Sequence, residues 1–145
     1  MYLGKFPAQI TSEHRMDLPP AFQDLLPAGA FITQGFERTL MLLQADTFLT
    51  VVKHAQEFTI TDPLVRLMFR LIMANAHQVE ADRSGSIEIP PSLADFAGIN
   101  GEVVVVGQGD YVEIWSPEAW LEQEAMLRDS RTNSSRFAHL ELIQV

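Results

Sequence analysis

The chain contains 145 residues, of which 47% are hydrophobic and 20% are charged, and it has no cysteine. This composition excludes intrinsic disorder for most of the chain and suffices for one compact core or two small coupled lobes. A chain without cysteine has no disulfide, thiolate metal site, iron–sulfur cluster or cysteine nucleophile. Ten basic against 19 acidic residues give a net charge of −9, so any binding to DNA requires a local basic patch.

The N-terminal residues 1–5 lack the charged segment followed by an apolar segment that marks a signal peptide. No apolar run approaches the roughly 20 residues that a membrane-spanning helix needs. We therefore expect a soluble, cytoplasmic protein that has no membrane partner.

The sequence contains an internal repeat. One pattern occurs at residues 15–26 (RMDLPPAFQDLL) and again, at an offset of 71 residues, at 86–97 (SIEIPPSLADFA). In both copies, alternating apolar and acidic residues precede two prolines, and an apolar residue and an aspartate follow them at fixed spacing. The alternation predicts a half-buried strand, and the prolines end that strand and open a short helix.

Each half is also predicted to contain a β-hairpin that turns at a glycine and leads into a helix. The paired strands are 30–33 with 39–43, and 103–106 with 111–115. The helix after the first hairpin covers about 46–56, and the helix after the second begins with the capping residue Ser116 and Pro117. The segment 107–109 is predicted to be a turn and not a nucleotide-binding loop.

A third helix is predicted between the halves, where Asp62 and Pro63 supply a cap and a first helical residue. This helix is apolar around most of its circumference, so we expect it either deep in the core or at a subunit interface. Its two arginines, Arg66 and Arg70, are expected to pair with Asp62 or with acidic residues of a neighbouring subunit rather than to form a DNA-binding stripe.

The C-terminal region is predicted from its composition. Residues 128–136 are polar and rich in serine, which favours a loop whose arginines are solvated. Four apolar side chains beyond this loop are expected to dock as a short strand or helix: Phe137, Leu140, Leu142 and Ile143.

The sequence shows no pattern typical of catalysis or metal binding. The histidines lack metal-ligand spacing, and no serine stands in a nucleophile-elbow pattern. We therefore expect no enzyme activity, no cofactor, no metal site and no small-molecule substrate. Trp115 and Trp120 are expected to pack in a core or a subunit seam rather than to stack on bases.

Blocks in both halves carry a resemblance to a known family. They are 2–6 (YLGKF), 31–40 (FITQGFERTL), the helix that contains Arg70, 76–90, and 105–120 (VVGQGDYVEIWSPEAW). Together they resemble the MraZ proteins, which are bacterial transcriptional regulators of the division and cell-wall gene cluster, over roughly residues 1–125. The resemblance implies an α+β fold of the AbrB/SpoVT superfamily, with two tandem swapped-hairpin β units, flanking helices and a pseudo-twofold internal repeat.

The resemblance also implies a domain organisation and a function. Residues 1–60 are expected to form the first AbrB/SpoVT-like repeat, 61–125 the second repeat with the linking helix, and 126–145 a polar tail. The implied function is a DNA-binding regulator of transcription that acts as a homo-oligomeric ring on repeated promoter elements. Its implied partner is double-stranded DNA, and its implied location is the nucleoid in the cytoplasm.

The signature of the family, Asp-x-x-x-Arg, is associated with DNA contact and is altered in both halves. Residues 11–15 (TSEHR) keep the arginine but not the aspartate, and residues 82–86 (DRSGS) keep the aspartate but not the arginine. Both copies are weakened for phosphate binding because positive charge is removed or opposed. The resemblance implies four candidate DNA-binding residues, with Arg83 standing in for the missing guanidinium: Arg15, Arg83, His14 and Ser86.

Each arginine of the two motifs also has a structural interpretation. Arg15 contacts a phosphate or a base edge, or it forms an ordinary surface ion pair with Glu13 or Asp17. Arg83 makes a similar contact, or it is a solvated loop charge. Asp82 is expected to cap its own turn by accepting backbone N–H groups.

The sequence leaves a second function open, a diverged ring-forming scaffold or protein-interaction module that has lost DNA recognition. The altered motifs and the net charge of −9 favour this alternative. The surface separates the two hypotheses, because a continuous positive face around Arg15 and Arg83 favours DNA binding, whereas an acidic face favours the scaffold.

Overall fold

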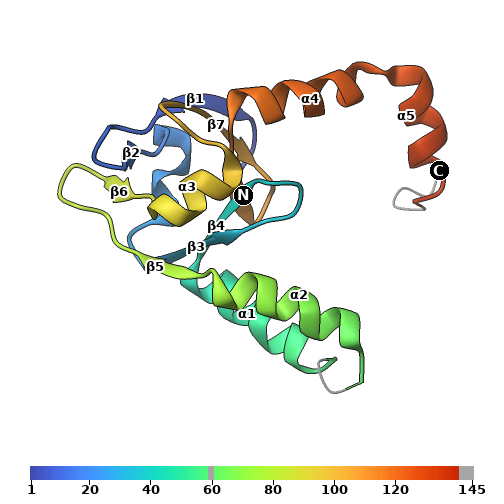
Figure 1. Cartoon of the computed structure of the whole chain (residues 1–145), viewed down its shortest axis with the longest axis horizontal. Helices are drawn as coiled ribbons and strands as arrows, with labels where there is room; N and C mark the ends of the chain where they lie inside the picture. Colours follow the sequence, from blue (N-terminus) through green and yellow to red (C-terminus); the bar gives the residue numbers. More distant parts are fainter. Residues whose placement is uncertain (59–60, 141–145) are drawn as a thin grey trace.

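The computed structural model describes residues 1–58 and 61–140, which form a mixed α+β fold built on an antiparallel sheet (Figure 1). The strands are β1 (Lys5–Gln9), β2 (Arg15–Asp17), β3 (Ala30–Gln34), β4 (Leu40–Gln44), β5 (His77–Val79), β6 (Ser86–Glu88), β7 (Glu102–Gly107) and β8 (Tyr111–Trp115). The helices are the 3-10 helix η1 (Pro20–Leu25), α1 (Ala45–Gln56), α2 (Pro63–Ala74), α3 (Pro91–Ala97), α4 (Pro117–Arg128) and α5 (Ser130–Phe137). Across the described residues, no helix combines the length and apolarity needed to cross a bilayer.

Most of the predicted elements are confirmed. Strands β2 and β6 precede the two Pro-Pro pairs, η1 and α3 follow them, and both predicted hairpins form as β3–β4 and β7–β8. The predicted helix caps are also present. The Asp62 carboxylate accepts the N–H of Leu64 at 2.9 Å, and the Ser116 hydroxyl accepts the N–H of Ala119 at 3.1 Å.

Both halves of the chain contribute alternately to the main sheet, whose strand order is β1-β7-β8-β4-β3-β5. Strands β4 and β8 pair at its centre, and β3 and β7, the other strands of the two hairpins, flank them on either side. The outer strand of each half pairs with the hairpin of the other half, β1 with β7 and β5 with β3. The two halves are therefore intertwined in a single sheet.

The small β2–β6 ladder reveals a pseudo-twofold axis. Its register pairs Arg15 with Glu88, Met16 with Ile87, and Asp17 with Ser86. Exchanging the halves at the offset of 71 residues converts the first pair into the third and leaves the central pair unchanged. The axis therefore passes between Met16 and Ile87, both of which are buried.

The β2–β6 ladder is held by a core to which both halves contribute. Met16 and Ile87 belong to the same buried cluster as Phe22, whose ring meets the rings of Tyr2 and Phe6 edge-on at 6.0 and 5.2 Å between centroids. Gly107 lets the N-terminal segment approach the second hairpin, because an added Cβ would lie 2.5 Å from backbone atoms of Tyr2. Residues of both halves thus pack beneath the ladder.

Helices α1 and α2 lie beside each other on one side of the sheet (Figure 1). A second, smaller buried cluster joins them to it and consists of Met41, Leu43, Phe48 and Ile72. Throughout α2, all of which is described, Ile72 alone is buried, while Leu64 and Leu67 are 74% and 63% exposed. The expectation that this helix lies deep in the core is therefore wrong for a single chain, because α1 and the sheet cover just one face of α2.

The C-terminal region corrects two predictions. Arg128 ends α4, and residues 130–136 lie in α5 and not in a loop, because the Asp129 carboxylate between the helices caps α5 by accepting the N–H of Thr132 at 3.1 Å. The Asn133 amide donates to the carbonyls of Met126 and Leu127, which ends α4 and fixes α5 against it.

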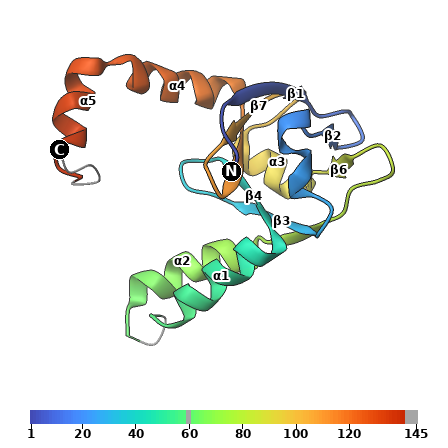
Figure 2. The ribbon, with the colours of Figure 1, turned by 180° about the vertical axis from the view of Figure 1, so that it is seen from behind.

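The predicted docking of the final apolar residues is also wrong where the structure describes them. Phe137 and Leu140 are 55% and 53% exposed, because α4 and α5 extend away from the sheet as an arm (Figure 2). The other two residues of that prediction, Leu142 and Ile143, lie outside the described part of the chain.

The base of this arm is anchored by tryptophan packing, which confirms the prediction for both tryptophans. Trp115 is buried, and its ring meets that of Trp120 edge-on with 5.7 Å between centroids. The Trp120 indole N–H donates to Glu124 at 2.9 Å, and Lys5 forms an ion pair with the same carboxylate. Helix α4 therefore attaches to the body through the face that carries Trp120 and Glu124.

Glu113 on β8 predicts a pH-dependent stability. Burial raises the pKa of this carboxyl, and the nearby charge of Glu37 adds to the effect. A group whose pKa is raised on folding stabilises the folded state while it is protonated and loses this contribution as the pH rises through the folded pKa. Replacement Glu113→Gln should therefore raise Tm more at pH 7 than at about pH 4, which lies near the ordinary glutamate pKa.

Thermal unfolding followed by circular dichroism at both pH values measures this difference. Glu102→Gln, at an exposed position of β7, is the matched control and should give the same small shift at both. An equal gain in Tm for Glu113→Gln at both pH values would contradict the assignment.

Candidate nucleic-acid interface

Two turns lead into the strands of the β2–β6 ladder, and the first comprises residues 11–14. The N–H of Thr11 donates to the carbonyl of Arg15 at 2.8 Å, and the N–H of His14 donates to the carbonyl of Thr11 at 2.9 Å. The Thr11 hydroxyl oxygen accepts the N–H groups of Glu13 and Arg15 at 3.3 and 3.2 Å. The side chain of Thr11 thus holds the turn closed.

The second turn, residues 82–85, repeats each of these bonds at the offset of 71 residues. The N–H of Asp82 donates to the carbonyl of Ser86 at 3.0 Å, and that of Gly85 donates to the carbonyl of Asp82 at 3.1 Å. One carboxylate oxygen of Asp82 accepts the N–H groups of Ser84 and Ser86 at 2.9 and 3.0 Å. The prediction that Asp82 caps its own turn is confirmed, and threonine performs the same function in the first turn.

The fourth residue of each turn has a left-handed backbone, with φ of 62° at His14 and 83° at Gly85. Glycine adopts this conformation at no steric cost, whereas other residues pay roughly 1 kcal/mol or more. The first turn keeps its geometry despite this cost, and it presents an exposed imidazole where the second turn presents no side chain.

Arg15 reaches across the ladder and contacts the second turn. Its Nη2 atom lies 3.0 Å from the carboxylate oxygen of Asp82 that the turn leaves unused, and it also donates to the carbonyl of Ser86 at 2.7 Å. Its Nε atom donates to the Ser86 hydroxyl at 3.2 Å. The expected ion pair of Arg15 with Glu13 or Asp17 is therefore wrong, because the two bonds to Ser86 direct the guanidinium toward the other half.

The pseudo-twofold axis explains both departures from the family motif. Exchange of the halves maps the Arg15–Asp82 pair onto residues 86 and 11, which are Ser86 and Thr11. The missing arginine and the missing aspartate are thus the two members of one pair. When one member of a charge pair is lost, the other is left without a partner, which is costly. When both members are absent, no unpaired charge remains. The two incomplete motifs together form one complete Asp–Arg pair.

Hydrogen bonding keeps Asp82 charged. The Ser84 hydroxyl, at 2.6 Å, is the largest of several influences that lower the pKa of the Asp82 carboxyl, and backbone N–H groups and Arg15 lower it further. At neutral pH the carboxylate is therefore available to Arg15.

The charge around the ladder is mixed. Acidic and exposed side chains flank Arg15 and Arg83: Glu13, Asp17, Asp82 and Glu88. Arg83 is exposed and has no hydrogen-bond or ion-pair partner among the described residues. The face therefore offers separate cationic points rather than a continuous positive surface.

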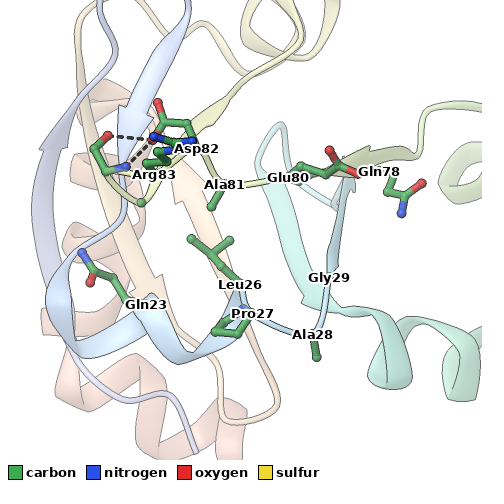
Figure 3. A pocket seen from close by; sticks show the side chains of 13 residues that line it. Gln23, Leu26, Pro27, Ala28, Gly29, Gln78, Glu80, Ala81, Asp82 and Arg83 are labelled. Carbon is green, nitrogen blue, oxygen red and sulfur yellow. Dashed lines mark hydrogen bonds between the residues drawn. The ribbon is translucent and has the colours of Figure 1, made fainter.

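A pocket of about 720 Å³ lies beside the second turn (Figure 3). Asp82 and Arg83 stand at one end, Gln78 and Glu80 at the other, and the segment 26–29 forms the floor between them. Arg15 lies outside this pocket and lines a separate groove of about 430 Å³ together with Thr11 and Ser86. The structure thus brings Arg15 and Ser86 together, and it places His14 and Arg83 on separate turns.

Sequence reasoning missed the contact of Arg15 with Asp82 and the capping role of Thr11. The offset of 71 residues contained the signal for both, because it aligns Thr11 with Asp82 and Arg15 with Ser86. As to metals, within residues 1–58 and 61–140 no three His, Asp or Glu side chains gather where they would hold an ion.

The fold and the site define an internally repeated α+β protein with two equivalent turns, of which the first is followed by Arg15 and the second contains Arg83. Comparison with known proteins agrees with this description. Residues 72–140 match the family model described as "MraZ protein, putative antitoxin-like". A protein of Thermomicrobium roseum named transcriptional regulator MraZ is 37% identical over 127 residues, which cover 88% of this chain and 89% of that protein.

Two further relatives bear the same name. The Corynebacterium kroppenstedtii protein is 31% identical over 143 residues, covering 99% of this chain and 100% of the relative. The Dictyoglomus thermophilum protein is 31% identical over 143 residues, covering 97% and 98%. The chain therefore belongs to the MraZ family, whose members are transcriptional regulators and not enzymes. The similarity extends beyond residue 125 and includes helices α4 and α5, which the resemblance over roughly 1–125 leaves out.

A double-mutant cycle tests the contact between the two halves. Arg15→Gln and Asp82→Asn each remove one charge, and the asparagine keeps an oxygen that caps the turn. We expect a favourable coupling in the free energy of unfolding that shrinks at high salt, because the pair is partly exposed and screened. The measurement is denaturant unfolding of the four proteins.

The matched control is the cycle of Arg15→Gln with Glu13→Gln, which should give no coupling. Equal coupling in both cycles, or coupling in the control alone, would show that Arg15 does not select Asp82.

Proposed function

We propose that this protein is a DNA-binding transcriptional regulator whose turns 11–14 and 82–85 face double-stranded DNA. It acts as a homo-oligomeric ring on repeated promoter elements of the division and cell-wall gene cluster, in the cytoplasm and at the nucleoid. Residues 1–60 and 61–125 are its two tandem swapped-hairpin units of the AbrB/SpoVT type, and 126–145 follow as a tail. The exchange of outer strands between the halves supports the swapped arrangement.

The observation that carries the proposal is the equivalence of the two turns about the axis between Met16 and Ile87. Duplex DNA has local twofold symmetry, and proteins that read it commonly present two equivalent elements. The names of the relatives, transcriptional regulator MraZ, support the same function.

Arg15 is prepared for a phosphate or a base edge. Asp82 and Ser86 engage its Nε and Nη2 atoms, whereas Nη1 makes no hydrogen bond with any residue in 1–58 or 61–140. A guanidinium carries five N–H donors, so donors remain for a ligand on a side chain that is already fixed. Fixing it in advance lowers the conformational entropy that binding would cost. Ser86 is in this view a positioning residue.

Arg83 and His14 supply the remaining contacts from exposed turns. Each copy of the chain offers few cations against a net charge of −9, so a single copy binds DNA weakly. An oligomer repeats the turns, and linked weak contacts add through a high effective concentration. Repeated promoter elements provide the matching array.

A second function, a ring-forming scaffold or protein-interaction module without DNA recognition, is favoured by one observation. Arg15 is already paired with Asp82, and the exposed acids Glu13, Asp17 and Glu88 surround it. In this alternative the arginine joins the two halves and does not contact a ligand.

Fluorescence anisotropy with the DNA upstream of the protein's own gene, against a scrambled duplex and across a salt series, tests the function. We expect tight binding to the native duplex that weakens as salt rises. Arg15→Ala should weaken it at least about tenfold and reduce the salt slope by about 0.9 for each copy that contacts the duplex, because each such copy loses one contact from a charged donor to a phosphate.

The matched control is Arg131→Ala on the exposed surface of α5, which should leave both quantities unchanged. Unchanged affinity and slope in Arg15→Ala would remove Arg15 from the interface. Equally weak binding to both duplexes at low salt would favour the scaffold.

A further inference from the structure

Helix α2 presents an uncovered apolar face. Its residues recur at helical spacing on the side opposite Ile72: Leu64, Leu67, Arg70, Leu71 and Ala74. Leu64 and Leu67 are 74% and 63% exposed, which is a large apolar area for neighbouring positions on one helix. The helix contains two arginines and no acidic residue, so this face is apolar and positively charged.

Helix α4 presents a second uncovered face with the opposite charge. Trp120 and Glu124 attach the helix to the body, and the opposite side carries Glu118, Leu121, Glu122 and Ala125. These residues follow the spacing i, i+3, i+4, i+7 of one helical face. Leu121 is 63% exposed, and both glutamates beside it are exposed.

The two faces match in length and are opposite in charge, and each carries exposed leucine. Both helices have 12 residues, which corresponds to about 18 Å. Three leucines and an alanine stand on the face of α2 with Arg70 beside them, and Leu121 and Ala125 stand on the face of α4 between Glu118 and Glu122. Packing of the two faces buries the leucines and places opposite charges at the rim, where they favour this partner over a pairing of two like-charged helices.

Within one chain the two faces do not meet. Helix α2 lies on one side of the sheet, and the arm of α4 and α5 extends from the other side in both views (Figures 1 and 2). Within the arm, the Asn133 amide bonds to the last turn of α4 and holds α5 against it. A partner for either face therefore has to come from another molecule.

We propose that α4 of one copy of this chain docks on α2 of a second copy, with Leu121 against Leu64 and Leu67, and Glu118 and Glu122 near Arg70. The inference rests on the homo-oligomer of the proposed function and names its interface. Such a contact joins two different surfaces. After two copies pair, the first still has a free α2 face and the second a free α4 face, and each can bind a further copy. Repetition of a head-to-tail contact produces a closed ring or an open filament and not an isolated dimer.

Crosslinking between introduced cysteines tests this interface, and the natural chain offers no cysteine to interfere. Three purified proteins, Leu67→Cys, Leu121→Cys and the double variant, are treated with a short bis-maleimide and separated on a denaturing gel. We expect a ladder of covalent multimers from the double variant and monomers from each single variant. The replaced leucines are exposed, and circular dichroism verifies that all three proteins are folded.

Two other patterns would overturn the inference. Multimers from Leu67→Cys or Leu121→Cys alone would show that like helices pack together, and monomers from the folded double variant would show that the faces do not meet. The matched control is Ser92→Cys combined with Leu121→Cys, because Ser92 is exposed on α3 away from both faces. It should give monomers.

A charge reversal and the native mass separate this inference from the proposed function. Arg70→Glu should reduce the mass of the assembly in multi-angle light scattering, and the further change Glu122→Arg should restore it. If the natural protein is oligomeric and the Arg70→Glu variant has the same mass, the interface is overturned and the proposed function still stands. A natural protein that is monomeric overturns the interface and the oligomer together, while DNA binding is measured separately by anisotropy.

Discussion

The contact of Arg15 with Asp82 and Ser86 connects the two halves of the chain, and the geometry of the site depends on how these halves are placed relative to each other. The turns on either side are each closed by their own first residue, Thr11 or Asp82, and the core beneath fixes the ladder. The guanidinium alone links one turn to the other through side-chain bonds. Loss of this contact therefore removes the side-chain link between the turns without unfolding either of them.

The pseudo-twofold axis makes this molecule symmetric in its backbone and asymmetric in its charge. On one side of the axis lies an ion pair, and on the equivalent side lie the uncharged Thr11 and Ser86. The two turns share their backbone hydrogen bonds, because Thr11 and Asp82 each close their own turn by accepting two equivalent N–H groups. Positive charge is unequally distributed, with Arg15 held near the axis and Arg83 exposed on its turn. The two turns then differ in the contacts they offer to one duplex.

Local elements of this fold follow from the sequence because their signals are local. Pro-Pro pairs, the caps Asp62 and Ser116, and alternating residues in the hairpins each act within a few positions. The pairing of strands between halves and the partner of Arg15 depend on contacts far apart in sequence, which local patterns do not specify. The serine-rich composition after residue 128 predicts a loop, and this prediction is wrong because Asp129 caps a helix there and Asn133 joins it to α4. The exposed face of α2 was foreseen in part, because an apolar helix that the core does not cover has to find a partner elsewhere.

The central claim is that Arg15, fixed by the opposite turn, contacts DNA together with Arg83. A nitrogen-detected NMR titration of the arginine Nε–Hε groups with the upstream duplex tests it most directly, since each arginine gives its own signal. The account predicts that the signals of Arg15 and Arg83, and the amide signals of the two turns, change together, while that of Arg131 does not. Changes confined to other arginines, with both turns unaffected, would contradict it.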